Sequence, residues 1–134
     1  MDAAEMFCAG PTACVDAPER AFCAPMERPL TAWQHDVIVA LAAVEGEESH
    51  TVRESVGHLV VTGGCDCGCA SFNVRDSRYP AQSHHLRHFA NGVAADGQVG
   101  FVLWLGPDGR PISVDVENEP GVLPDPSTII ASAP

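Results

Sequence analysis

The sequence predicts an α+β fold: one or two N-terminal helices packed on an antiparallel sheet of about four strands, with an irregular N-terminal arm. Apolar residues recur at helical spacing after Thr31, whereas apolar and polar residues alternate in several segments after His58. Turn signals such as Gly106-Pro107-Asp108-Gly109 separate these segments. The chain has 134 residues, 46% of them hydrophobic, and is therefore long enough to bury one core.

Three regions follow from these patterns. Residues 1–28 hold three cysteines and several prolines, so we expect an irregular arm that is ordered only where something ties it down. Residues 29–125 are expected to form a single α+β domain. Residues 126–134 are expected to form an extended, proline-punctuated C-terminal tail.

The helices are predicted by their capping signals. Thr31–Gln34 matches a capping box, and Gly46 suits the C-terminal stop of the helix that follows. A second, short helix is expected over Thr51–Val56, which also begins with a capping box and is followed by Gly57. The apolar stripe of the first helix comprises Trp33, Val37, Leu41 and Val44.

Four strands are expected after the helices, and their apolar positions supply most of the core. They cover His58–Thr62, Ala70–Arg75, Val99–Leu105 and Ile112–Glu117, with the first two paired around a cysteine-rich turn. Residues Tyr79–Gln98 show no clear pattern and suit a helical turn or a long loop. The predicted core residues are Trp33, Val37, Leu41, Leu59, Val61, Phe72, Val74, Phe101, Leu103, Ile112, Val114 and Val116.

Charge excludes several classes of function. The formal net charge is −11, and all seven basic residues are arginine. The absence of lysine excludes a Schiff base and a P-loop lysine, and the acidic balance argues against nucleic-acid binding, which needs a clustered basic surface. We also expect no membrane span, and the acidic start lacks the features of a signal peptide, so a cytoplasmic location is predicted.

The stretch Gly63–Ala70, GGCDCGCA, is the main candidate site. Cys65, Cys67 and Cys69 alternate, so in extended chain their sulfurs would share one face, and the neighbouring glycines allow a tight turn. Thiolates bind soft metals, and Zn²⁺ takes four ligands, so a fourth must come from elsewhere. Cu(I) is the second candidate metal.

The arm and a histidine cluster could supply that further ligand. The arm offers Cys8, Cys14 and Cys23, whose spacing matches no established metal motif. In the stretch HHLRH, His84 and His88 would share a face at i, i+4 if the stretch were helical. The alternative for the histidines is a polar surface cluster.

Two other interpretations of the cysteine turn stay open. Cysteines also pack as small apolar side chains, which would make the turn structural without any metal. They also serve as reactive thiols, which would make the chain a thiol-based redox sensor or enzyme using Cys65, Cys67 or Cys69. No catalytic residue is assigned, and we interpret Asp115 and Glu117 as the solvent-facing side of an amphipathic strand.

The stretches Leu59–Val74, GFVLWLGPDGRPISVDVE and LPDPSTI resemble a group of small uncharacterised actinobacterial proteins with a Cys-x-Cys-Gly-Cys turn. The likeness covers roughly residues 30–130 and excludes the arm cysteines and the HHLRH cluster. It implies the architecture given above and no activity. The lysine-free, Ala/Gly/Arg-rich composition is typical of GC-rich coding and fits an actinobacterium or one of its bacteriophages.

The function predicted from the sequence is therefore a non-enzymatic protein-binding module, stabilised by a cysteine-ligated zinc if the metal interpretation holds. A protein partner is expected, and neither nucleic acid nor a membrane. The zinc-stabilised binding module and the thiol-based redox sensor or enzyme differ in cysteine reactivity, because metal-held thiolates are shielded whereas a sensor thiol is exposed.

Overall fold

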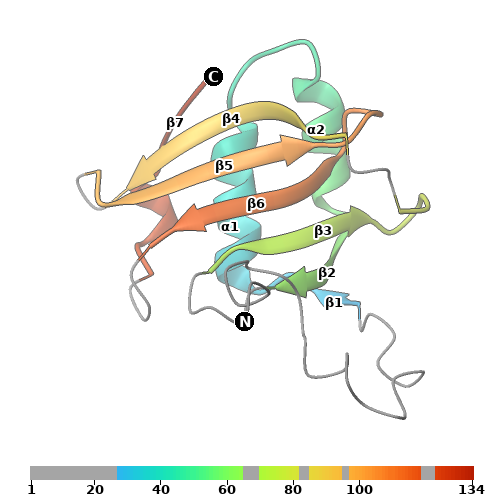
Figure 1. Cartoon of the computed structure of the whole chain (residues 1–134), viewed down its shortest axis with the longest axis horizontal. Helices are drawn as coiled ribbons and strands as arrows, with labels where there is room; N and C mark the ends of the chain where they lie inside the picture. The colour runs from blue at the N-terminus through green and yellow to red at the C-terminus, as the bar shows by residue number, and fades with distance from the viewer. Residues whose placement is uncertain (1–26, 65–69, 82–84, 95–96, 119–122) are drawn as a thin grey trace, which may run out of the picture.

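The computed structural model describes residues 27–64, 70–81, 85–94, 97–118 and 123–134 (Figure 1). Two helices and one antiparallel sheet make up this part of the chain. The elements in chain order are β1 (Arg28–Pro29), α1 (Ala32–Ala42), α2 (Ser49–Val56), β2 (Leu59–Gly64), β3 (Phe72–Asp76), β4 (Arg87–Ala94), β5 (Val99–Leu105), β6 (Pro111–Glu117), the 3-10 helix η4 (Pro126–Thr128) and β7 (Ile130–Ser132).

The sheet has seven strands in the order β1-β2-β3-β6-β5-β4-β7, so the prediction of about four strands is wrong. Every neighbouring pair is antiparallel. Figure 1 shows both helices on the same side of the sheet, behind it in this view. The two edge strands, β1 and β7, are two and three residues long.

The three additional strands are those whose sequence carries little strand signal. β4 has no regular alternation, because a bulge at Phe89 shifts the register between His88 and Ala90. β1 and β7 are too short for any periodic pattern. β7 pairs with β4 and brings the C-terminal residues onto the sheet.

Helix α1 begins with the capping box expected from the sequence. The Thr31 hydroxyl accepts from the Gln34 amide at 3.1 Å, and the Gln34 side chain accepts from the Thr31 amide at 2.9 Å. The helix ends at Ala42, before the expected stop at Gly46. Arg53 supplies the cap instead, because its guanidinium donates to the Ala42 carbonyl at 2.9 Å and to the Ala43 carbonyl at 3.2 Å.

Helix α2 begins two residues earlier than expected. It starts at Ser49, and its N-cap residue Glu48 makes no side-chain capping hydrogen bond, so the expected capping box at Thr51 does not form. The Glu48 carboxylate instead forms an ion pair with Arg87 on β4. A long-range ion pair therefore replaces the local cap at this helix end.

The core lies between the helices and one face of the sheet. Ten of the twelve predicted core residues are buried there, while Trp33 and Ile112 are only partly buried. Trp33 Nε1 donates to the Pro124 carbonyl at 2.9 Å, and this hydrogen bond ties α1 to the C-terminal segment. Further buried residues are Ile38, Val52, Phe89, Val99 and Leu105.

Candidate binding surface on the uncovered sheet face

The face of the sheet opposite the helices is covered by none of the elements that the structure describes (Figure 1). The strand registers arrange its side chains in rows. One row crosses the sheet as Ile130, Val93, Gly100 and Glu117, from β7 through β4 and β5 to β6. The next row is Ser132, Asn91, Val102 and Asp115. The β7–β5 side of this face is thus largely apolar, and its β6 side is acidic.

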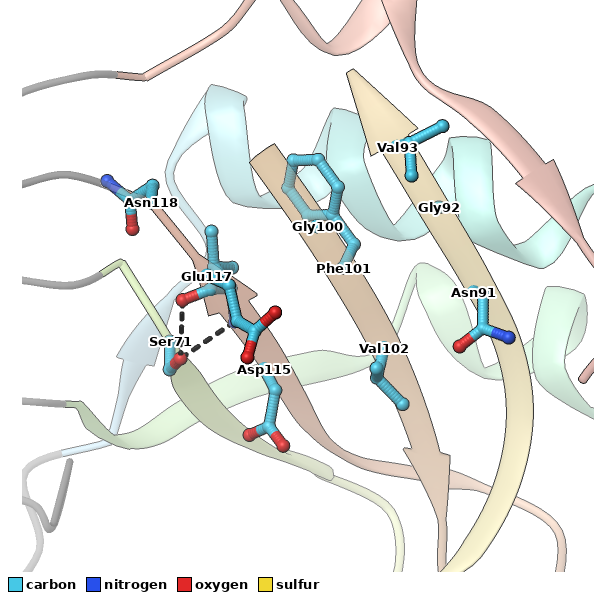
Figure 2. Close-up of a pocket in the computed structure, with 11 residues that line it drawn as sticks. Ser71, Asn91, Gly92, Val93, Gly100, Phe101, Val102, Asp115, Glu117 and Asn118 are labelled. Carbon is cyan, nitrogen blue, oxygen red and sulfur yellow. Dashed lines mark hydrogen bonds between the residues drawn. The ribbon is translucent and has the colours of Figure 1, made fainter. Parts of the chain in front are cut away.

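Gly100 makes a hollow in this face (Figure 2). It lies between Val93 on β4 and Glu117 on β6, and a Cβ at Gly100 would approach no atom closer than the Glu117 carboxylate at 3.5 Å. The hollow has a volume of about 690 Å³ and extends past Val102 and Asp115. It is therefore large enough to accept side chains of a bound molecule.

An aromatic pair borders the same face. The rings of His88 and Trp104 lie 5.0 Å apart at an angle of 37°. The Trp104 indole Nε1 donates to the Asp115 carboxylate at 3.0 Å, and His88 Nε2 is hydrogen bonded to the Asn91 amide oxygen at 2.8 Å. These bonds fix four side chains from three strands, so this part of the surface is already ordered before any partner binds.

The acidic side of the face is not neutralised by the arginines of the described chain. Five of these arginines form ion pairs with carboxylates elsewhere: Arg53 with Glu45, Arg75 with Glu27, Arg78 with Asp76, Arg87 with Glu48 and Arg110 with Asp108. Arg28 lies on β1, three strands away from β6. Within the described segments, no ion pair involves Asp115 or Glu117, which are both exposed.

The residues next to the cysteine turn are attached to the end of β6. Ala70, the first described residue after the turn, donates its amide to the Asn118 side chain at 3.1 Å. The Ser71 hydroxyl accepts from the Val116 amide at 2.8 Å and donates to its carbonyl at 3.3 Å (Figure 2). Ser71 thereby continues the β3–β6 pairing through its side chain and forms one wall of the hollow.

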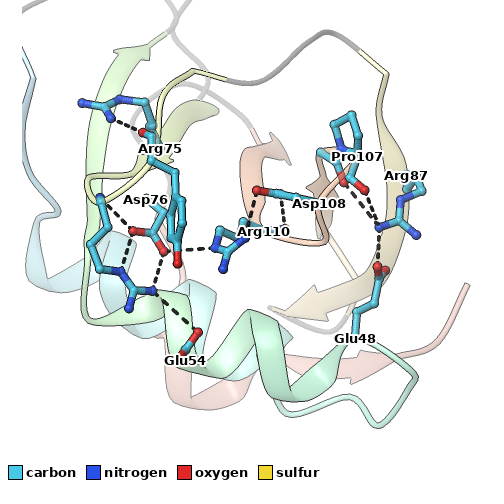
Figure 3. A network of polar contacts seen from close by, with 11 residues as sticks. Glu48, Glu54, Arg75, Asp76, Arg87, Pro107, Asp108 and Arg110 are labelled. Carbon is cyan, nitrogen blue, oxygen red and sulfur yellow. Dashed lines mark hydrogen bonds and ion pairs between the residues drawn. The ribbon is translucent and has the colours of Figure 1, made fainter.

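A second polar cluster, around Asp76, has a different character (Figure 3). Asp76 is 1% exposed, and Arg78 donates to its two oxygens at 3.0 and 2.8 Å. Arg110 Nε lies 3.5 Å from the same carboxylate, and its guanidinium stacks 3.9 Å from the centre of the Tyr79 ring. Burial raises the pKa of Asp76, but the Arg78 hydrogen bonds outweigh it and lower this pKa to about 2.

Shifted pKa values often mark functional sites, but this one has a structural explanation. Both carboxylate oxygens of Asp76 are occupied by Arg78 within the turn that follows β3. Arg78 also lies 3.7 Å from Glu54 on α2. The cluster therefore joins the β3 turn to α2 and to the β5–β6 turn, and we assign it to stability.

The predicted metal ligands fall mostly outside the described residues. This applies to Cys8, Cys14, Cys23, Cys65, Cys67, Cys69 and His84. His88 lies on β4, so the helical spacing that related it to His84 does not apply, and its ring contacts Trp104 instead. Among the residues with described positions, no group of three or more His, Cys, Asp or Glu side chains is arranged to hold a metal ion. The zinc prediction is therefore untested.

Sequence reasoning did not identify this candidate surface. It recognised Asp115 and Glu117 as one side of an amphipathic strand but gave them no role. The available signal was the alternation of Gly100, Val102 and Trp104 along β5, which places a glycine and two large side chains on the face opposite Phe101. Their pairing with β4 and β6 is non-local and required the structure.

Comparison with known proteins gives no match: no protein-family model, curated protein or solved structure is similar to this chain. The resemblance to small actinobacterial proteins therefore stays a prediction. None of the helices in the described segments is long and apolar enough to cross a membrane.

Proposed function

We propose that the protein is a non-enzymatic binding module and that the uncovered face of its sheet binds a partner protein. The observation that carries the proposal is the hollowed, half-apolar face over β4, β5 and β6, which the helices leave open. Val93 and Ile130 expose 44% and 71% of their surfaces there. Exposed apolar groups beside ordered polar groups are typical of protein interaction surfaces.

Enzymatic chemistry has less support from the same face. His88 and Asp115 do not contact each other, and each is hydrogen bonded to a neighbour that orients it within the sheet. The Ser71 hydroxyl in the wall of the hollow is hydrogen bonded to the backbone amide and carbonyl of Val116, which accounts for it by the pairing of β3 with β6. Binding therefore accounts for the arrangement better than acid–base or nucleophilic catalysis.

Site-specific photo-crosslinking tests the proposal. A photoreactive amino acid at Val102, on the uncovered face, is compared with one at Val39, which is 47% exposed on α1. We expect a defined protein to crosslink from Val102 and not from Val39 in cells of the source organism. The purified partner should then bind the wild-type chain and lose affinity for Gly100→Val. Equal crosslinking from both positions, or none, would overturn the proposal.

Zinc and reactive thiols remain separate predictions for the cysteines. Native mass spectrometry of freshly reduced, full-length protein, with a thiol count before and after chelation, distinguishes them. One zinc, with thiols appearing only after chelation, is expected for a structural site, and stability should then fall on chelation. An apo mass with all six thiols reactive at once would remove zinc and leave the redox or packing interpretations.

A further inference from the structure

We infer that the occupant of the uncovered face is a basic segment of a partner protein, with an arginine side chain seated in the hollow at Gly100. This inference rests on the proposed function and adds the chemistry of the partner. It combines three features of the face: two carboxylates that form no ion pair with the arginines of the described segments, a hollow beside them, and apolar groups across the hollow.

The charge of the uncovered face indicates the charge of the partner. Asp115 and Glu117 are two residues apart on β6, so they project from the same face, about 7 Å apart by the rise of a strand. Five of the described arginines are used in other ion pairs, and no arginine of the described segments forms an ion pair with these carboxylates. A cationic partner would supply the missing charge, whereas the phosphates of a nucleic acid or an anionic membrane would be repelled.

The hollow gives the shape of the group that binds. The Gly100 position leaves space between Val93 and Glu117, with the Asp115 carboxylate in the next row. An arginine stem can lie against Val93 and Val102 while its guanidinium reaches Glu117, because long basic side chains combine an apolar stem with a charged end. Arginine suits this place better than lysine, since its planar group donates two parallel hydrogen bonds to a carboxylate.

The apolar side chains beside the hollow indicate which residues of the partner would flank that arginine. Ile130, Val93 and Val102 lie on the β7–β5 side of the hollow and would contact small aliphatic side chains that flank the basic residue. A segment that alternates aliphatic and basic residues therefore matches the surface. Such a segment buries the exposed valine and isoleucine and neutralises the two acids in one contact.

Two other occupants are disfavoured by the same charges. A second copy of the chain carries a net charge of −11 and would bring acids against acids. Residues 1–26 of the chain itself contain four acidic residues and a single arginine. Neither provides the basic, aliphatic pattern, so a foreign basic segment is the occupant to test first.

The test is an NMR titration of the full-length, ¹⁵N-labelled protein. The probe is a blocked peptide of alternating valine and arginine, compared at low ionic strength with valine–lysine and valine–glutamate peptides of equal length. We expect the arginine peptide to shift the amides of Val93, Gly100 and Val102 and the Trp104 indole. The glutamate peptide should bind about tenfold more weakly or not at all, and the lysine peptide in between.

Matched variants locate the contact. Gly100→Val fills the hollow, and the double substitution Asp115→Asn with Glu117→Gln removes the two carboxylates; each should weaken the arginine peptide about tenfold. The control double substitution, Asp36→Asn with Glu47→Gln, changes the net charge by the same amount at exposed positions on the helix side. It should alter binding by less than about twofold, which separates local contact from general charge attraction.

Several outcomes would overturn the inference. These are equal binding of arginine and glutamate peptides, shifts confined to other surfaces, no binding of any peptide, or no effect of the two face variants. Shifts that depend on protein concentration without peptide would assign the face to a second copy instead. If photo-crosslinking still finds a partner at Val102 while the arginine peptide fails, the proposed function stands and only the partner chemistry is wrong.

Discussion

Gly92 and Gly100 lie on neighbouring strands, one residue apart in register, yet a side chain at each would point to opposite faces of the sheet. At Gly92 a Cβ would lie 2.7 Å from Leu41 Cδ2 and 3.0 Å from Ile129 Cγ2, because α1 and the C-terminal segment pack closely there. At Gly100 the nearest atom would be a carboxylate oxygen at 3.5 Å. The first glycine permits close packing, and the second leaves a hollow in an open surface.

The acidic residues on the two faces of the sheet differ in the same way. Asp76, on the covered side, is 1% exposed and accepts three hydrogen bonds from Arg78. Asp115 and Glu117, on the uncovered side, are exposed and form no ion pair with any arginine of the described segments. The difference supports the proposal that the covered face serves stability and the open face binds a partner, and the following substitutions test that division.

The largest effect is expected from Asp76→Ala. The substitution leaves Arg78 and the partly buried Arg110 without their shared carboxylate, so the free energy of unfolding should fall by about 3 kcal/mol. Chemical denaturation at neutral pH measures the loss. The control is Glu54→Ala, which removes an exposed carboxylate 3.7 Å from the same Arg78 and should cost less than about 0.5 kcal/mol. Equal costs for the two variants would contradict the structural role of Asp76.

The same carboxylate predicts a loss of stability in acid. Its pKa is lowered from 3.8 to about 2 in the folded chain, so the stabilisation is fully present above pH 4 and disappears as the pH falls toward 2. The shift corresponds to about 2 kcal/mol. The wild type should have a higher free energy of unfolding than Asp76→Asn at pH 5. As the pH is lowered from 5 to 2, this difference should shrink by the same amount. A difference that does not depend on pH would show that the Asp76 charge is not responsible.

Gly92→Ala should destabilise the protein by about 1.5 kcal/mol, because the added methyl group overlaps Leu41 and Ile129 in a packed core. Thermal and urea unfolding both measure this change. If Gly92→Ala costs less stability in a Leu41→Ala background than in the wild type, the steric explanation is supported. Wild-type stability of Gly92→Ala would contradict the close approach of α1 to β4.

Gly100→Ala should stabilise the protein, whereas Gly92→Ala should destabilise it. The position is free of close contacts and has no positive φ, so the loss of unfolded-state freedom should raise the free energy of unfolding by about 0.5 kcal/mol. The comparison with Gly92→Ala by urea unfolding is direct, since both replace a strand glycine by alanine. Destabilisation by more than about 1 kcal/mol would show that the hollow is not open.

The smallest effect on stability is expected from Asp115→Asn with Glu117→Gln. Surface carboxylates without a cationic partner contribute little, so the free energy of unfolding should change by less than about 0.5 kcal/mol. Loss of peptide binding without loss of stability would separate the binding role from folding. A large loss of stability would mean that these acids support the fold, against the division of roles between the faces.

Much of the fold was accessible from local sequence signals, and the errors have identifiable causes. The Thr31 capping box and the strands β5 and β6 depend on short-range patterns, and the structure has them at or within one residue of the expected positions. β4 was missed because its bulge at Phe89 and its glycine at position 92 break the alternation. The start of α2 was misplaced because Glu48 is held by Arg87, a residue from a distant strand.

The candidate binding surface was beyond sequence reasoning for a similar reason. Alternation predicted that Asp115 and Glu117 share a side of their strand, but which strands lie beside it depends on the order β3-β6-β5-β4. Only that strand order places Gly100 next to Glu117. The same order brings the Trp104 indole within hydrogen-bonding distance of the Asp115 carboxylate. The cysteines that dominated the sequence reasoning lie outside the described residues.

The short outer strands have a consequence for the behaviour of the protein in concentrated solution. β1 has two residues, one of them Pro29, and β7 has three, so neither edge offers a long row of free amides and carbonyls to another sheet. The part of β4 that β7 leaves unpaired contains the bulge and begins with Arg87 and His88. Fibril growth by edge-to-edge stacking is therefore disfavoured, although the sheet spans seven strands and none of the described elements covers one of its faces.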